Sequence, residues 1–177
     1  MTKLQPWKEV HRETLLNKYG RAVDKVDFKL PSGRIADYYI KREQAALCAV
    51  ALTPDQDVIM TRQYRPGPNA ILLELPGGAP EPGETNEQAI AREVLEETGY
   101  TGNLRFVTSC IDDAYTEITR YIYVATNCQK TAEPILTDSE QIEVAILTLA
   151  EFRDYLRSGR GTDIEAGYLA LDFLGLL

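Results

Sequence analysis

The chain has 177 residues, enough for one domain with a hydrophobic core and a small additional unit. A net charge of -8 argues against the basic stripe that nucleic-acid binding requires, so no nucleic-acid partner is expected. No apolar run approaches the roughly 20 residues of a membrane span, so no membrane partner is expected either. Three cysteines without C-x-x-C spacing indicate free thiols and a cytoplasmic location.

The first part of the chain predicts a β-hairpin at residues 20–41. Two stretches with β-forming residues flank the turn sequence Pro31-Ser32-Gly33. Because the hairpin precedes the first strongly apolar strand, residues 1–44 are expected to form a small antiparallel β-unit. Residues 45–177 would then form the main domain.

The remaining sequence predicts strands interleaved with few helices. Strands are expected at 45–52, 58–64, 104–111, 118–125 and 142–149, with a short apolar run at 71–75. Two helices, at 150–158 and 163–174, would close the chain. This order favours an α/β fold with a mixed sheet packed between helices.

The strongest helix signal lies between Gly83 and Gly99. Thr85 is a good N-cap, Gln88 completes a capping box, and Gly99 suits the C-terminal end. At about 100° per residue, an apolar arc separates from an acidic arc. The apolar arc contains Ile90, Ala91, Val94, Leu95 and Thr98, and the acidic arc contains Glu93, Glu96 and Glu97.

The acidic arc is either a solvated helix face or a cation site. Like charges at i,i+4 spacing destabilise a helix, and the negative end of the helix dipole adds to the repulsion. Carboxylate oxygens suit Mg²⁺ or Mn²⁺ better than zinc. The glycines of the preceding loop, residues 77–84, would let the backbone approach a ligand closely.

The same segment resembles the signature of the Nudix hydrolase family. Gly78, Glu84 and the run Arg92-Glu93-Val94-Leu95-Glu96-Glu97-Thr98-Gly99-Tyr100 follow the pattern G-x5-E-x7-R-E-U-x-E-E-x-G-U. Only the last aliphatic position is relaxed, to Tyr100. The resemblance implies a Nudix α/β/α sandwich with a mixed β-sheet.

Flanking sequence is similar to the ADP-ribose pyrophosphatase and nucleotide-sugar diphosphatase branch. Residues 61–66 and 74–78 resemble the stretch that leads into the signature there. The turn at Pro31-Ser32-Gly33 resembles the N-terminal β-unit that this branch exchanges between subunits. The resemblance therefore implies a homodimer in which residues 1–44 act as the dimer arm.

The resemblance also implies roles for individual residues. The metal ligands would be Glu93, Glu96, Glu97 and the Gly77 carbonyl, with Mg²⁺ as the cofactor and Mn²⁺ as the alternative. Arg92 would orient the carboxylates, and Glu84 would stabilise the loop.

A second acidic segment, Asp138-Ser139-Glu140, precedes the strand expected at 142–149. By resemblance to the ADP-ribose branch, Glu140 would be a metal ligand and Asp138 the base that activates water. The alternative is an ordinary polar turn. The catalytic candidates are thus Glu96, Glu97, Asp138 and Glu140.

Candidate substrate-binding residues are one arginine and several aromatic residues. Arg65 could hold a terminal phosphate bidentately or be a surface residue. A base needs an aromatic side chain to stack on, although such residues more often pack in cores or interfaces. The aromatic candidates are Trp7, Tyr38, Tyr39 and Tyr115.

The expected activity is cleavage of the diphosphate bond in a nucleoside diphosphate-linked compound, such as ADP-ribose or another nucleotide sugar. The Ser-Pro-Gly element of ADP-ribose hydrolases is replaced here by Asp112-Asp113-Ala114-Tyr115. Tyr115 instead resembles a tyrosine of dinucleoside polyphosphate hydrolases, which are the alternative enzymes. A non-catalytic nucleotide-sugar sensor is the alternative of another class.

Overall fold

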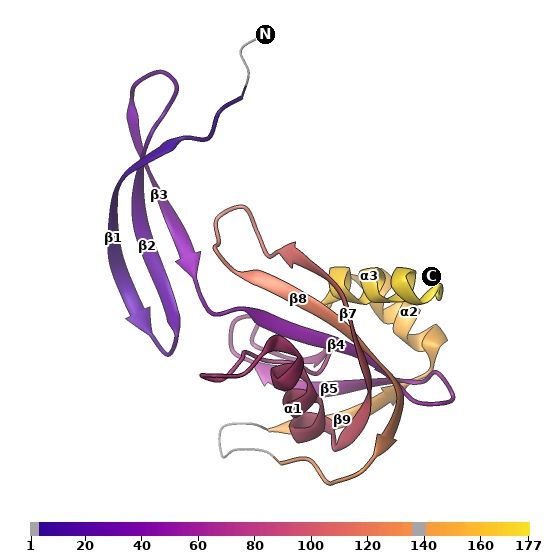
Figure 1. The fold of residues 1–177 in the computed structure, drawn as a ribbon. Coiled ribbons are helices and arrows are strands. Elements are labelled where there is room, and N and C mark those ends of the chain that lie inside the picture. Colours follow the sequence, from indigo (N-terminus) through magenta and orange to yellow (C-terminus); the bar gives the residue numbers. More distant parts are fainter. Residues whose placement is uncertain (1–3, 136–140) are drawn as a thin grey trace. The chain divides into compact units, whose positions relative to one another are not determined.

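The computed structural model describes residues 4–135 and 141–177, and Figure 1 shows its elements. The chain forms two compact units. One contains the residues up to Ala45 together with Ile111–Thr119, and the other contains Ala46–Cys110 and Arg120–Leu177. The domain boundary expected after residue 44 stays a prediction.

The first unit is an antiparallel sheet of three strands, in the order β1-β2-β3. The strands are β1 (Lys8–Lys18), β2 (Arg21–Lys29) and β3 (Ile35–Arg42). The expected hairpin is confirmed, and Gly33 adopts the positive φ of 85° that its turn requires. Strand β1 was not predicted from the sequence, because almost all of it is exposed and no apolar alternation marks it.

The small sheet contains a buried carboxylate. Asp24, in β2, is fully buried and accepts hydrogen bonds from Arg12, Thr14 and Arg42 at 2.8–3.3 Å. The Arg42 guanidinium holds the pKa of Asp24 well below its usual range, and Thr14 adds to the effect. The ion pairs therefore keep Asp24 charged inside the unit.

The second unit is built on a mixed sheet in the order β6-β5-β4-β8-β7, with β9 paired to β5. Its central pair, β4 with β8, is parallel, whereas β4 with β5 and β5 with β6 are antiparallel. The strands are β4 (Ala46–Leu52), β5 (Val58–Arg65), β6 (Ala70–Glu74), β7 (Tyr100–Ile111), β8 (Thr119–Lys130) and β9 (Ile142–Leu147).

Strand β4 is buried along nearly its whole length, and its alternate side chains face two different cores. Leu47 and Ala49 pack with Ile90 and Val94 of α1 (Asn86–Thr98). The next residues in alternation, Cys48, Val50 and Leu52, pack with the other two helices, α2 (Leu149–Ser158) and α3 (Ile164–Leu174).

Helices therefore cover both faces of the mixed sheet (Figure 1). The expected α/β/α sandwich with an additional antiparallel β-unit is confirmed. None of the helices in the described parts of the chain is long and apolar enough to cross a membrane.

Candidate functional site

Helix α1 begins and ends where the sequence predicts. The Thr85 side chain accepts the Gln88 backbone N–H, and the Gln88 side chain accepts the Thr85 N–H, so the capping box is formed. Gly99 ends the helix in the left-handed conformation, with φ 76°. These caps set the position of every carboxylate on the helix.

The loop before α1 is attached directly to β4. The Leu47 N–H donates to the Gly78 carbonyl at 2.8 Å, and the Ala49 N–H donates to the Pro76 carbonyl at 3.0 Å. A Cβ at Gly77 would lie 2.1 Å from the Leu47 oxygen and 2.8 Å from the Cys48 Cα. Only glycine permits this approach of two backbones.

Glu97 is buried against this loop, with 9% of the residue exposed. One carboxylate oxygen, Oε2, accepts the Gly77 N–H at 2.9 Å. Glu97 is therefore not a solvated residue of the acidic arc, because the loop covers that side of the helix. Ala91, expected on the apolar arc, is exposed.

Glu93 faces the next glycine of the loop. A Cβ at Gly78 would lie 2.3 Å from Glu93 Oε1 and 2.5 Å from its carboxyl carbon. Glycine at position 78 therefore provides the space that the Glu93 carboxylate occupies. The carboxylate is largely shielded from solvent, with 17% of the side chain exposed.

Arg92 joins three carboxylates of the signature. Its Nη1 donates to Glu93 Oε1 and to Glu96 Oε2, both at 3.0 Å. Its Nε and Nη2 donate to the two oxygens of Glu84 at 2.9 and 3.0 Å. The bidentate pair with Arg92 holds the pKa of Glu84 below its usual value.

Glu84 also closes the loop on itself, because its Oε2 accepts the Glu81 N–H at 2.8 Å. Arg92 Nη2 donates to the Ala79 carbonyl at 3.3 Å as well. The arginine thus ties the loop to the helix while holding Glu93 and Glu96 on one side.

The oxygen donors of this cluster match what a hard divalent cation prefers. In the arrangement that the structure records, Arg92 supplies the positive charge. Across residues 4–135 and 141–177, no three acidic, histidine or cysteine side chains are already grouped as a metal site.

Arg65 and Glu74 form a strong ion pair beside the loop. Arg65 Nε donates to Glu74 Oε2 at 2.7 Å, with the Glu74 side chain 4% exposed and the Arg65 side chain 44% exposed. Arg65 was predicted as a phosphate ligand, but the buried Glu74 was missed. The only signal for it was an acid inside the apolar run 71–75.

Three further polar residues near Glu74 were also missed by sequence reasoning. Thr162 donates to Glu74 Oε1 at 2.9 Å, and Asp163 accepts the Leu75 N–H at 3.3 Å. Arg120 donates to Asp163 at 3.3 Å. Burial raises the pKa of Asp163 despite this arginine. Thr162 and Asp163 are adjacent, but they lie far from Glu74 and Arg120 in the sequence, and no pattern links the three positions.

The predicted aromatic residues lie in the first unit, where three of them pack together. The Tyr38 ring lies 5.5 Å from the Trp7 ring and is stacked on the Tyr115 ring at 6.3 Å between centroids. Trp7 and Tyr115 remain 45% and 57% exposed. Tyr39, on β3, is also 57% exposed. Tyr38 therefore packs against two of the residues proposed to stack on a base, Trp7 and Tyr115.

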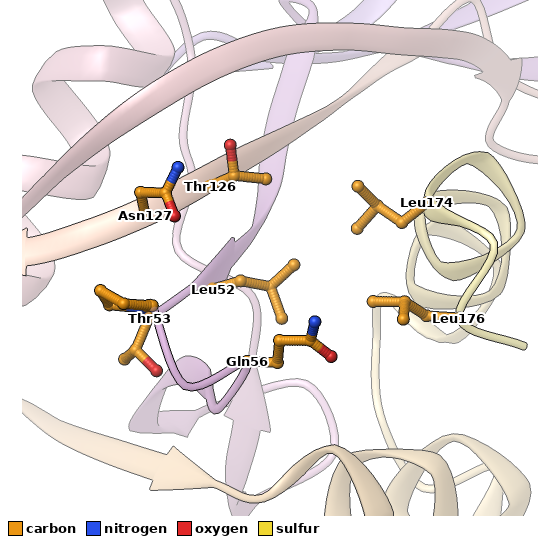
Figure 2. Close-up of a pocket in the computed structure, with 8 residues that line it drawn as sticks. Leu52, Thr53, Gln56, Thr126, Asn127, Leu174 and Leu176 are labelled. Atoms are coloured by element: carbon orange, nitrogen blue, oxygen red, sulfur yellow. The ribbon is translucent and has the colours of Figure 1, made fainter.

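A cavity of about 200 Å³ lies elsewhere in the second unit, and Figure 2 shows the side chains that line it. It is lined by Leu52, Thr53, Pro54, Gln56, Thr126, Asn127, Leu174 and Leu176. None of these lining residues carries a titratable side chain or was predicted to act in the site. The cavity is distinct from the carboxylate cluster.

The remaining two candidates, Asp138 and Glu140, lie outside the described residues. Their roles as base and metal ligand stay predictions.

Comparisons with known proteins agree with the geometry. The chain is 29% identical over 156 residues to the methanol dehydrogenase activator of Bacillus methanolicus, covering 85% of this chain and 82% of that protein. It is 27% identical over 153 residues to the ADP-ribose pyrophosphatase of Bacillus subtilis (strain 168), with the same coverage of 85% and 82%.

Among solved structures, the crystal structure of an ADP compounds hydrolase matches over 100% of both chains, with a TM-score of 0.82 and 23% identity. That likeness shows a shared fold. The NUDIX domain profile matches residues 41–165, well over half of the chain. The chain belongs to the NUDIX domain family.

Proposed function

We propose that the chain is a metal-dependent hydrolase that cleaves the diphosphate bond of a nucleoside diphosphate-linked compound, such as ADP-ribose or another nucleotide sugar. The products would be a nucleoside monophosphate and a phosphorylated remainder. The observation that carries this proposal is the placement of the signature glutamates. Arg92 gathers Glu93 and Glu96, while Gly77 and Gly78 fit closely against Glu97 and Glu93.

We further propose that Mg²⁺, or Mn²⁺ in its place, is the cofactor. The residues that would hold it are Glu93, Glu96, Glu97, the Gly77 carbonyl and Glu140. A bound divalent cation would neutralise phosphoryl oxygens and lower the pKa of a water molecule.

Side chains of the protein would accept a proton, bind a phosphate and hold the metal ligands in place. Asp138 would accept the proton of the attacking water. Arg65 would bind a phosphate, because a guanidinium offers five N–H donors and only Nε is engaged with Glu74 in the ion pair. The Arg92 contacts would keep Glu93 and Glu96 in place before the substrate arrives.

The exposed aromatic residues support recognition of a nucleoside base. Trp7, Tyr39 and Tyr115 are the proposed platforms, and the stacked pair of Tyr38 and Tyr115 would keep one ring in place. The relative named ADP-ribose pyrophosphatase supports an adenine nucleotide linked to a sugar. A homodimer, with residues 1–44 as the arm, belongs to the same proposal. Free thiols support a cytoplasmic location.

A dinucleoside polyphosphate hydrolase is the second candidate, and Tyr115 is the observation that favours it. A non-catalytic sensor is disfavoured because every glutamate of the signature is present and placed together.

A substrate screen tests the proposal. ADP-ribose, other nucleotide sugars and dinucleoside polyphosphates would each be incubated with Mg²⁺ or Mn²⁺, and products would be separated by chromatography. We expect a nucleoside monophosphate from a nucleotide sugar, and no product in excess EDTA. Exclusive cleavage of dinucleoside polyphosphates would favour the second candidate. Binding of a nucleotide sugar with no turnover would favour the sensor.

A further inference from the structure

Glu74 is a buried carboxylate whose two oxygens are both engaged. It lies in β6 and is 3% exposed. Its Oε2 accepts from Arg65 at 2.7 Å, and its Oε1 accepts from the Thr162 hydroxyl at 2.9 Å. A buried carboxylate is costly unless such partners satisfy it, so the two contacts together determine where the carboxylate lies.

Thr162 belongs to the segment between α2 and α3, far from β6 in the sequence. Its hydroxyl contacts two carboxylates, Glu74 at 2.9 Å and Asp163 at 3.2 Å, and the contact with Glu74 is the shorter. Thr162 therefore donates to the Glu74 oxygen that Arg65 does not contact.

The segment around Thr162 is attached at several points. Arg120, in β8, donates to the Thr162 carbonyl at 2.9 Å and to Asp163 and Glu165 at 3.3 and 2.6 Å. Asp163 also accepts the Leu75 N–H, in the residue that follows β6. The backbone at Thr162 and the neighbouring Asp163 are thus bonded to β8 and to the residue that follows β6, with the Thr162 hydroxyl beside Glu74.

The series of contacts that begins at Thr162 and passes through Glu74 ends at Arg65. Its Nε is directed at Glu74, so the direction of the planar guanidinium follows from the position of that carboxylate. Four further N–H donors lie on its terminal nitrogens, and 44% of the side chain is exposed. The exposed edge is where an anion would bind.

We propose that Thr162 is a positioning residue that, through Glu74, orients the Arg65 guanidinium toward a phosphate of the substrate. This inference rests on the proposed function, in which Arg65 binds a phosphate. Thr162 does not touch the substrate. Its contribution is to reduce the freedom that Arg65 would lose on binding, so it acts on substrate affinity rather than on the chemical step.

The test is the kinetics of Thr162→Val, which removes the hydroxyl at nearly constant volume. We expect KM to rise about tenfold, as for the loss of one hydrogen bond to a charged group, with kcat within about twofold of wild type. Thr162→Ser should restore KM. Thr162→Ala removes the same hydroxyl and serves if the valine variant does not fold. Thr101→Val, at an exposed position in β7, is the matched control and should leave both constants unchanged.

A double-mutant cycle separates positioning from a general structural effect. In an Arg65→Ala background, Thr162→Val should change KM by less than about twofold, because the group it orients is gone. Equal effects in both backgrounds, or a wild-type KM for Thr162→Val, would overturn the inference while leaving the proposed function intact. A wild-type protein that hydrolyses no nucleoside diphosphate compound would overturn both.

Discussion

Replacing Gly78 with alanine should lower catalytic activity while leaving the stability of the fold nearly unchanged. The substitution adds one carbon atom, the Cβ, beside the Glu93 carboxylate. The added Cβ would lie 2.3 Å from Glu93 Oε1, whereas ordinary van der Waals contact begins near 3.4 Å. The Glu93 carboxylate must therefore move by about 1.1 Å, which also strains its 3.0 Å hydrogen bond from Arg92. A misplacement of about 1 Å in a catalytic site lowers activity roughly 100-fold, or about 2.7 kcal/mol of transition-state stabilisation.

Stability should change little in the same variant. The atoms that the Cβ meets belong to the end of a flexible side chain, which can rotate away. We expect the free energy of unfolding to fall by less than about 1 kcal/mol, a Tm change of about 2–4 °C or less for a chain of this size.

Two other glycines provide the controls. At Gly77 the added Cβ would meet backbone atoms of Leu47 and Cys48, which cannot rotate away, so Gly77→Ala should cost about 1–3 kcal/mol or more of stability. Gly67→Ala meets nothing within 4 Å and should be neutral in both respects. Steady-state kinetics on the best substrate give kcat/KM, and thermal unfolding gives the change in stability. Gly78→Ala with kcat/KM within threefold of wild type would refute the reasoning.

Four further results are expected. Glu97→Gln should lower kcat by orders of magnitude, and wild-type turnover should vanish in EDTA and return with Mg²⁺; turnover that persists in EDTA would contradict the metal proposal. Asp138→Asn and Glu140→Gln should lower kcat while KM stays nearly unchanged; if both remain within about threefold, less than 1 kcal/mol is lost and the base lies among the signature glutamates. Analytical ultracentrifugation should show a homodimer, as expected if residues from the first 45 of one subunit touch the ligand of the other; a compact monomer at micromolar concentration argues against the arm. Asp24→Asn should lower Tm at pH 7. Because the pKa of Asp24 is depressed in the folded state, its contribution is present above the unfolded-state pKa of about 3.9 and declines below it, so the Tm difference should shrink with acid; a difference that grows would contradict the ion-pair explanation.

Local signals in the sequence were enough to locate most elements of the fold. The alternation in β2 and β3, the fully apolar β4, and the caps at Thr85 and Gly99 each act within a few residues of the chain. The prediction of α1 and its acidic residues therefore agreed with the structure. Strand β1 was missed because its residues are exposed and its pairing with β2 is a contact that composition does not record.

The candidate site also combines features that follow from the local sequence with features that depend on contacts between distant elements. The capping residues and the helical periodicity predict that Glu93, Glu96 and Glu97 share one helix. The burial of Glu97 under Gly77 does not follow from that pattern, because a loop attached to β4 covers a helix face that the periodicity marks as polar.

The contacts around Arg65 were decided by the tertiary structure alone. Glu74, Thr162 and Arg120 come from β6, the segment before α3 and β8, and only the packing of these elements brings them together. Sequence periodicity reports the environment along one element, whereas hydrogen bonds among buried polar groups depend on distances between elements. The sequence therefore determined the chemistry of the site, and the fold decided how its side chains are held.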